Sequence, residues 1–100
     1  MPPHLVEEAL RLLDRRRAEG RAEDPRVHDA CTGSGCVAVA LQQVRPGALV
    51  SASDLSQGAE EVFRLNCRRL LGRELPFQRS DLLRQVAGPY ELITANPPYL

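Results

Sequence analysis

The stretch "RVHDACTGSGCVAVAL" (residues 26–41) decides the fold that this sequence predicts. Its first five residues, "RVHDA" (26–30), read as a short strand that runs into a glycine turn, "CTGSG" (31–35). From Ser34 to Val44 the apolar residues recur at helical spacing, at Cys36, Val37, Ala40, Leu41 and Val44, and "RPG" (45–47) ends the helix. A strand, a tight turn and a helix in this order are typical of a βαβ unit.

The rest of the sequence continues this alternation. Residues 5–17 carry an apolar helical stripe, and "ALVSASD" (48–54) reads as a second strand. A further helix is predicted over residues 57–71, with Ser56 as its N-cap and Gly72 at its end; its inward residues would be Ala59, Val62, Phe63, Asn66 and Leu70. A weaker strand is predicted at 75–81, a turn or short helix at 81–86, and at 90–95 a fourth strand, covered on both faces.

These elements predict an α/β fold: a Rossmann-like open parallel sheet of about four strands with three flanking helices. Ligands of such sheets bind at the carboxyl ends of the strands. We assign residues 1–24 to a leading helix and linker, and residues 25–100 to the sheet domain.

Composition excludes several classes of protein. One hundred residues make one small domain, and thirteen basic and thirteen acidic residues cancel, so no net field attracts nucleic acid or an acidic membrane. The start "MPPHLVEE" does not read as a signal peptide, and the apolar run "CVAVAL" is too short to span a bilayer. The cysteines at 31, 36 and 67 have no zinc-type spacing, so we expect no metal, a reducing cytoplasmic location, and core positions for Cys36 and Cys67.

The glycine turn and the end of the second strand predict a cofactor pocket. Gly33 and Gly35 permit close approach of a ligand, and the free N–H groups of the following helix face it. With Ala38 they also fit a G-x-G-x-x-A dinucleotide fingerprint, completed by Asp54 after the next strand. The Asp54 carboxylate can accept both ribose hydroxyls of an adenosine-type cofactor; alternatively, it only caps the next helix.

Asp29 favours one cofactor over another. A carboxylate at the mouth of the glycine turn repels the pyrophosphate of NAD, whereas it attracts an ammonium or sulfonium group. S-adenosylmethionine carries both of these cations, together with the ribose and the adenine. Asp81 could accept a hydrogen bond from the adenine amino group, while Leu82 covers the ring.

The last strand end, "ITANPPYL" (93–100), suggests a methylation site for a planar nitrogen. Two prolines end the strand and hold Asn96 extended. The Asn96 side-chain oxygen and the Pro97 carbonyl can accept both N–H bonds of an amide, which orients its nitrogen towards a methyl donor. Tyr99 can stack on the planar group.

Together these stretches resemble the class I S-adenosylmethionine-dependent methyltransferases. More narrowly, "TGSGCVAVAL", "ASDLS", "SDLL" and "LITANPPYL" resemble the family that methylates the glutamine side-chain amide in the Gly-Gly-Gln loop of peptide chain release factors. The resemblance implies substrate contacts at Asn96, Pro97, Pro98 and Tyr99, of which Asn96, Pro97 and Tyr99 are catalytic. It implies cofactor contacts at Asp29, Cys31, Thr32, Gly33, Ser34, Gly35, Asp54, Leu55, Asp81, Leu82 and Asn96.

The chain also departs from that family. Cys31 replaces the first glycine of the usual loop, where a side chain is tolerated only if φ is negative. The family's preceding helical domain and later strands are not in this sequence, so we expect a fragment with half of the catalytic fold. Its fourth strand would be an exposed sheet edge through which the chain could associate.

Three other functions remain open. Enzymes that methylate amino groups of adenine or guanine in nucleic acids use similar Asn-Pro-Pro-aromatic stretches, but they need a basic, aromatic-bearing surface. A non-catalytic remnant that binds S-adenosylmethionine or a partner is the second, and a nucleotide-dependent dehydrogenase is the third.

Overall fold

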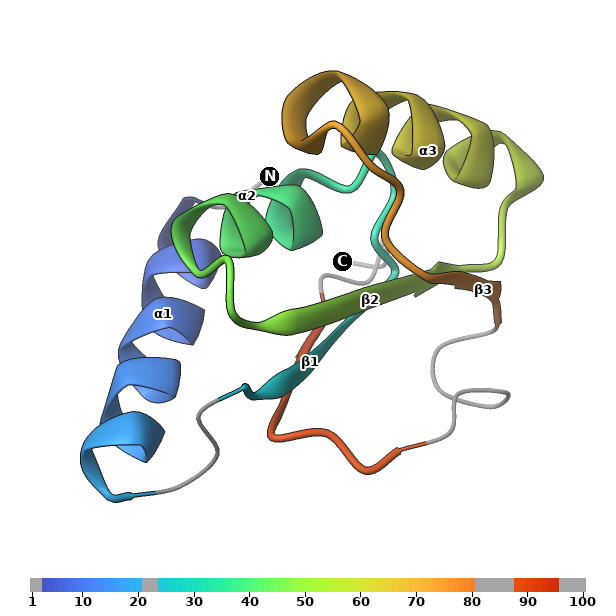
Figure 1. Ribbon diagram of the computed structural model, residues 1–100. Coiled ribbons are helices and arrows are strands. Elements are labelled where there is room, and N and C mark those ends of the chain that lie inside the picture. Colours follow the sequence, from blue (N-terminus) through green and yellow to red (C-terminus); the bar gives the residue numbers. More distant parts are fainter. Residues whose placement is uncertain (1–2, 21–23, 81–87, 96–100) are drawn as a thin grey trace.

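The computed structural model describes residues 3–20, 24–80 and 88–95, and these form an open sheet of four parallel strands with three helices (Figure 1). In chain order the elements are α1 (Pro3–Ala18), β1 (Arg26–Ala30), α2 (Cys36–Val44), β2 (Leu49–Asp54), α3 (Gln57–Leu71), β3 (Phe77–Arg79) and β4 (Leu92–Ala95). The strand order is β3-β2-β1-β4. Strands β1, β2 and β3 follow one another towards one edge of the sheet, and β4 pairs with the other side of β1. The predicted α/β class and the parallel sheet are confirmed.

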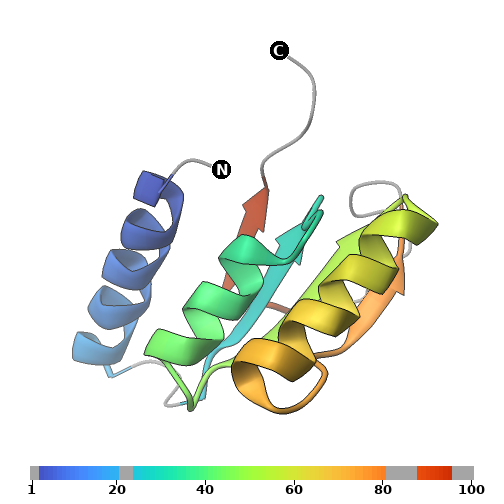
Figure 2. The same cartoon turned by 90° about the horizontal axis from the view of Figure 1, so that it is seen from above.

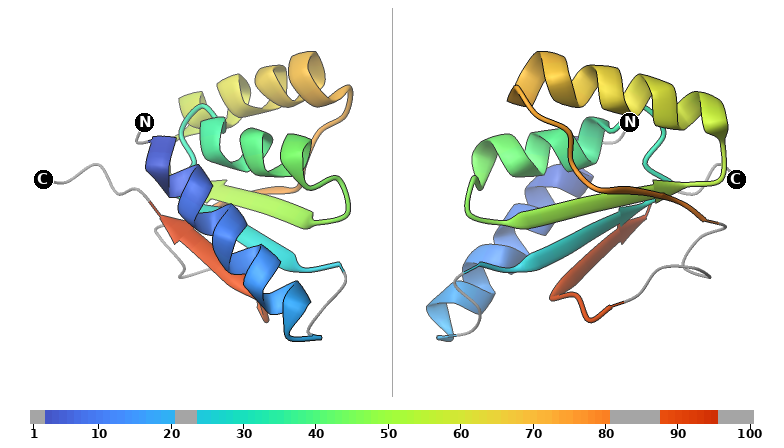
Figure 3. Two further views of the ribbon diagram at one scale, coloured as in Figure 1. Left: turned by 90° about the vertical axis from the view of Figure 1, so that its left-hand side faces the viewer. Right: turned by 45° about the vertical axis from the view of Figure 1, so that its right-hand side comes forward.

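The three helices lie side by side over the same face of the sheet, as Figures 2 and 3 show from different sides. The central helix α2 packs against both α1 and α3, and α1 reaches across to β4. The core between this helical layer and the sheet consists of apolar residues from five elements and two connections: Ala9, Leu13, Val27, Val37, Ala38, Val39, Leu41, Ala48, Val50, Ala52, Phe63, Cys67 and Leu75.

Helix α3 keeps its predicted ends but turns a different face to the core. Ser56 accepts a hydrogen bond from the backbone N–H of Ala59 (3.2 Å), and Gly72 closes the helix with φ 75°. The buried residues are Phe63 and Cys67, whereas Val62 and Leu70 are 46% and 56% exposed, so their predicted inward positions are wrong. Apolar residues occur on two sides of this helix, and the packing against β2 and β3 selects one of them.

Other predictions need smaller corrections. Helix α2 begins at Cys36, which is exposed and not a core residue, and Val44 at its other end is 48% exposed. The third and fourth strands are shorter than predicted, and residues 81–86 lie outside the described part of the chain. Ile93 in β4 is 45% exposed, so the prediction of a strand covered on both faces is wrong: the helices of the described chain all lie on the other face.

On the face of the sheet away from the helices, a buried histidine joins β1 to β2. The two ring nitrogens of His28 each lie 2.8 Å from a serine hydroxyl, Nδ1 from Ser51 and Nε2 from Ser53. The ring of Tyr90 covers His28, with the ring centres 5.0 Å apart. Burial lowers the pKa of the His28 imidazole, because the charged form loses its hydration.

Candidate functional site

The glycine loop, residues 31–35, connects the carboxyl end of β1 to the first turn of α2 and has the backbone that its glycines predict. Gly33 has φ +56° and Gly35 has φ +87°, both in the left-handed region that glycine adopts without strain. Gly35 is also the N-cap of α2, and a Cβ atom on it would lie 2.5 Å from Cδ1 of the buried Phe63 ring. The position therefore requires glycine for two independent reasons.

Cys31 contradicts the expectation that a side chain at this position has a negative φ. Its φ is +57°, so a residue with a Cβ atom occupies the left-handed region at the start of the loop. This conformation costs about 1–2 kcal/mol for a residue other than glycine. The surrounding loop bonds must therefore hold it in place.

Two neighbouring elements, β2 and α3, hold the glycine loop. The backbone N–H of Thr32 donates to the carbonyl of Ser53 at the end of β2 (2.9 Å). The side-chain amide of Asn66 on α3 donates to the carbonyl of Ser34 (2.9 Å). The sequence predicted that Asn66 faces inward, and the structure gives the reason: it holds the loop against α3.

Asp54, at the carboxyl end of β2, lies directly beside the loop. Its Oδ2 accepts a hydrogen bond from the N–H of Gly33 (2.9 Å), and its Oδ1 accepts one from the N–H of Ser56 (3.0 Å). Ser56 itself caps the first turn of α3 by accepting from the N–H of Ala59, so Asp54 contacts that helix only through the N–H of its N-cap residue. Each carboxylate oxygen keeps a further lone pair, and the neighbouring Leu55 is 65% exposed. The half-buried carboxylate can thus still accept hydroxyl donors of a ligand.

Asp29 lies beneath the loop and not on its surface, since it is only 2% exposed. Its Oδ2 accepts from the Thr32 hydroxyl (2.8 Å) and its Oδ1 from the Thr94 hydroxyl of β4 (2.7 Å). Burial raises the pKa of the Asp29 carboxyl, while the two threonine hydroxyls oppose this shift and lower the pKa. Thr94 was not among the predicted site residues. The sequence places it two positions before Asn96 and hence on the same face of the strand, but only the register of β4 with β1 sets it beside Asp29.

The remaining predicted site residues, Asp81, Leu82 and residues 96–99 (Asn96, Pro97, Pro98 and Tyr99), lie outside the described residues. The sheet nevertheless shows where β4 ends. Ala95, its last residue, pairs with Ala30, the last residue of β1 before the glycine loop. The last described residue of β4 and the start of the loop therefore lie next to each other at the same edge.

Residues 3–20, 24–80 and 88–95 contain no group of three or more His, Cys, Asp and Glu side chains arranged to hold a metal ion. In the same ranges, no helix is both long and apolar enough to cross a membrane.

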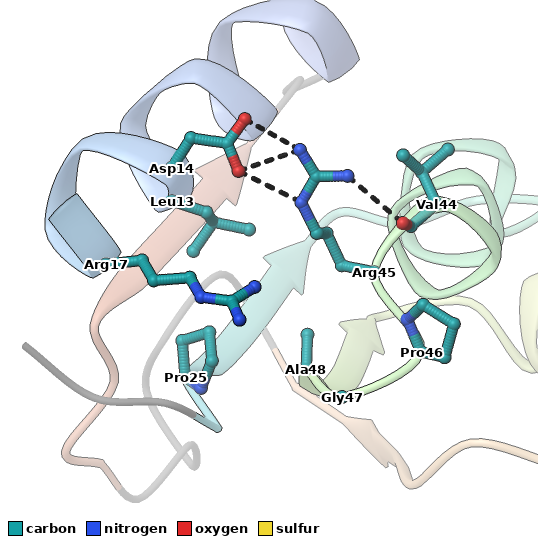
Figure 4. Close-up of a pocket in the computed structure, with 9 residues that line it drawn as sticks. All are labelled: Leu13, Asp14, Arg17, Pro25, Val44, Arg45, Pro46, Gly47 and Ala48. Carbon is teal, nitrogen blue, oxygen red and sulfur yellow. Dashed lines mark hydrogen bonds and ion pairs between the residues drawn. The ribbon is translucent and has the colours of Figure 1, made fainter.

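A separate pocket of about 360 Å³ lies at the opposite end of the sheet, where β1 and β2 begin (Figure 4). Arg45 closes one side through its ion pair with Asp14 (2.7 Å), and Arg17 points into the pocket from the last turns of α1. Buried Gln42 supports this end, since its amide donates to the carbonyl of Ala48 (2.8 Å). The helix N-termini and the glycine loop lie at the other end, so this pocket is not part of the candidate site.

Comparison with known proteins identifies the family. A family model described as the methyltransferase small domain matches residues 9–100. The chain belongs to this methyltransferase family. The glycine loop, Asp54 and Asp29 all lie inside the matched range.

Individual members of the methyltransferases agree with this assignment. The chain is 41% identical over 97 residues to a release factor glutamine methyltransferase of Deinococcus radiodurans, which covers 97% of this chain and 31% of that protein. It is 40% identical over 73 residues to a ribosomal protein uL3 glutamine methyltransferase of Xylella fastidiosa, covering 72% of this chain and 23% of that protein.

A solved methyltransferase confirms the fold. The crystal structure of magnesium protoporphyrin IX methyltransferase from Synechocystis PCC 6803 with bound SAH superposes with a TM-score of 0.67 at 25% identity, covering 90% of this chain and 41% of that one. The chain spans about a third or less of the length of the curated relatives it matches.

We predict that Gly35→Ala destabilises this methyltransferase domain by about 2–4 kcal/mol, because it combines the cost of a left-handed side chain with a clash against Phe63. Gly72→Ala is the matched control: Gly72 has φ +75° but nothing within 4 Å of the added Cβ, so it should lose only about 1 kcal/mol. Urea unfolding followed by circular dichroism measures both. Equal losses in the two variants would show that Phe63 moves aside freely.

We predict that Cys31→Gly is about 0.5–1 kcal/mol more stable than Cys31→Ala, because only the alanine retains the strained left-handed side chain. The comparison cancels the loss of the thiol, which both variants share. Urea unfolding again gives the difference. An alanine variant as stable as the glycine variant would mean that the backbone at this position carries no strain.

Proposed function

We propose that this chain is the cofactor-binding part of a protein-glutamine N-methyltransferase that uses S-adenosylmethionine and acts on the Gly-Gly-Gln glutamine of peptide chain release factors. The observation that carries the proposal is the hydrogen bond from the N–H of Gly33 to Asp54, which joins the glycine loop to a carboxylate at the neighbouring strand end. In this reading residues 25–100 hold the cofactor, and α1, within residues 1–24, completes the core beneath them.

The residues at this site fit S-adenosylmethionine. The free lone pairs of Asp54 would accept the ribose hydroxyls, and exposed Leu55 would lie against the adenosine. The backbone of the glycine loop, from Cys31 to Gly35, would follow the amino-acid part of the cofactor. Asp29 beneath the loop adds negative charge, which favours the ammonium and sulfonium groups over the pyrophosphate of NAD. Asp81 and Leu82 would complete the adenine pocket.

For methyl transfer we retain the roles that the sequence predicts at 96–99. S-adenosylmethionine supplies the methyl group. The Asn96 side chain and the Pro97 carbonyl would accept the two N–H bonds of the glutamine amide, which aims the nitrogen lone pair at the methyl carbon. Pro98 and Tyr99 would contact the planar amide, and the proton would leave after the nitrogen becomes cationic.

Glutamine in a protein is the substrate class that both named relatives share, since one is named for release factors and the other for ribosomal protein uL3. We rank the release factor first because that relative matches 97% of this chain and the other 72%. The three cysteines form no disulfide with one another, which fits a reducing compartment such as the cytoplasm.

We predict that the chain binds S-adenosylhomocysteine in calorimetry and that Asp54→Ala binds about 10–100-fold more weakly, since hydrogen bonds to a charged group contribute about 1.5–3 kcal/mol. Glu61→Ala, at an exposed acid on α3, removes the same charge away from the site and should bind normally. A ligand that lacks the ribose 2′-hydroxyl tests whether Asp54 binds this group. The parent chain should bind it more weakly than S-adenosylhomocysteine, whereas Asp54→Ala should bind the two ligands equally.

No binding by a chain that circular dichroism shows to be folded would contradict the cofactor assignment. Tighter binding of NAD would support the dehydrogenase instead.

We expect the chain to transfer a radiolabelled methyl group to a release factor in preference to its Gly-Gly-Gln→Gly-Gly-Asn variant, because the site recognises the position of the amide. We expect it to prefer the release factor to uL3 as well, because the site also recognises the Gly-Gly-Gln loop. Transfer to uL3 alone would reassign the substrate. Binding to RNA or DNA that weakens steeply with salt, with methylation of a base, would support the nucleic-acid alternative.

A further inference from the structure

Thr94 makes a buried contact that links β4 to β1 under the glycine loop. Its hydroxyl donates to Oδ1 of Asp29 (2.7 Å), and the two residues are register partners in the parallel sheet. Thr94 is 4% exposed and Asp29 is 2% exposed, so water does not replace this bond.

The Asp29 carboxylate also binds the glycine loop and the first turn of α2. Its other oxygen accepts from the Thr32 hydroxyl of the loop (2.8 Å), and the carboxylate also accepts from the backbone N–H of Ala38 in the first turn of α2. That turn needs a partner from elsewhere, because its N-cap, Gly35, has no side chain to supply one. One carboxylate thus connects β4, the glycine loop and α2.

We propose that Thr94 is a positioning residue for the cofactor loop: its hydroxyl keeps the Asp29 carboxylate ionised and aimed so that it holds Thr32 and the first turn of α2. The consequence for cofactor affinity rests on the proposed function of the loop, whereas the effect on Asp29 does not.

The groups around Asp29 determine in which direction loss of the Thr94 hydroxyl shifts the pKa of the Asp29 carboxyl. Burial raises the pKa of its carboxyl, as does the negative charge of Asp54 on β2, whereas the Thr94 and Thr32 hydroxyls and the Ala38 amide lower it. His28 precedes it on β1 but points to the opposite face, where serine hydroxyls bind both of its nitrogens. Removing the Thr94 hydroxyl therefore raises the Asp29 pKa further.

The direction of the effect on cofactor affinity follows from this shift in the Asp29 pKa. The carboxyl is ionised only above its pKa, and the ionised form holds the loop and attracts the cationic ammonium. Affinity for S-adenosylhomocysteine should therefore fall as the pH drops through the Asp29 pKa. In Thr94→Val that fall should begin at a higher pH.

The test compares the parent chain with Thr94→Val, which keeps the shape of the side chain, and Thr94→Ser, which keeps the hydroxyl. Carbon-detected NMR follows the Asp29 carboxyl during a pH titration without ligand. Calorimetry then measures S-adenosylhomocysteine affinity at several pH values. Ile93→Val, on the exposed face of β4, controls for changes to the strand itself.

We expect Thr94→Val to titrate Asp29 at a higher pH and to bind the ligand at least tenfold more weakly near that pH, with Thr94→Ser close to the parent chain. An unchanged Asp29 titration in Thr94→Val overturns the proposal. A shifted titration with an unchanged pH profile of affinity overturns the link to the cofactor loop. If the parent chain binds no ligand, the proposed function fails, and the NMR titration alone still decides the role of Thr94.

Discussion

The buried carboxylate of Asp29 is the interaction on which the candidate site depends. Moving a carboxylate out of water is costly unless donors replace the lost hydration. Here the donors come from three different elements: Thr94 on β4, Thr32 in the glycine loop and the Ala38 amide on α2. Each of these must be in place before the carboxylate is satisfied. The requirement couples the order of the strands to the shape of the loop.

Neighbouring residues of β2 and α3 likewise hold the glycine loop. Asp54 accepts from Gly33, Asn66 donates to the Ser34 carbonyl, and Phe63 fills the space below Gly35. Cys31 lies in the same loop with a left-handed backbone, a conformation that persists only where the surrounding structure holds it. A loop fixed in this way presents its amides without reorganisation, which is what binding a small cofactor requires.

The arrangement of layers explains the parts of the sheet that have no cover. Helices α1, α2 and α3 share one face, so Ile93 of β4 is exposed on the other, and β4 forms an edge of the described sheet (Figure 3). The chain spans about a third or less of the relatives it resembles. An apolar strand at such an edge tends to pair with a further strand. Association of the chain through this edge, which the sequence predicts, stays a prediction.

Local patterns in the sequence predicted much of this protein correctly. A strand followed by a glycine turn and a helix, the N-cap at Ser56, and the position of Asp54 at the end of β2 each depend on a few consecutive residues, so their geometry follows from backbone sterics and hydrogen-bonding capacity. The same residues located the candidate site, because parallel strands bring their carboxyl ends to one edge.

Only the tertiary structure decided which side of α3 is buried, that Cys36 is exposed, that Cys31 is left-handed, and that Thr94 reaches Asp29. These features depend on contacts between residues far apart in the chain. Helical periodicity offers α3 two apolar sides, and only packing against β2 and β3 chooses between them. Likewise, a threonine in a strand has no defined partner until strand order and register set β4 beside β1.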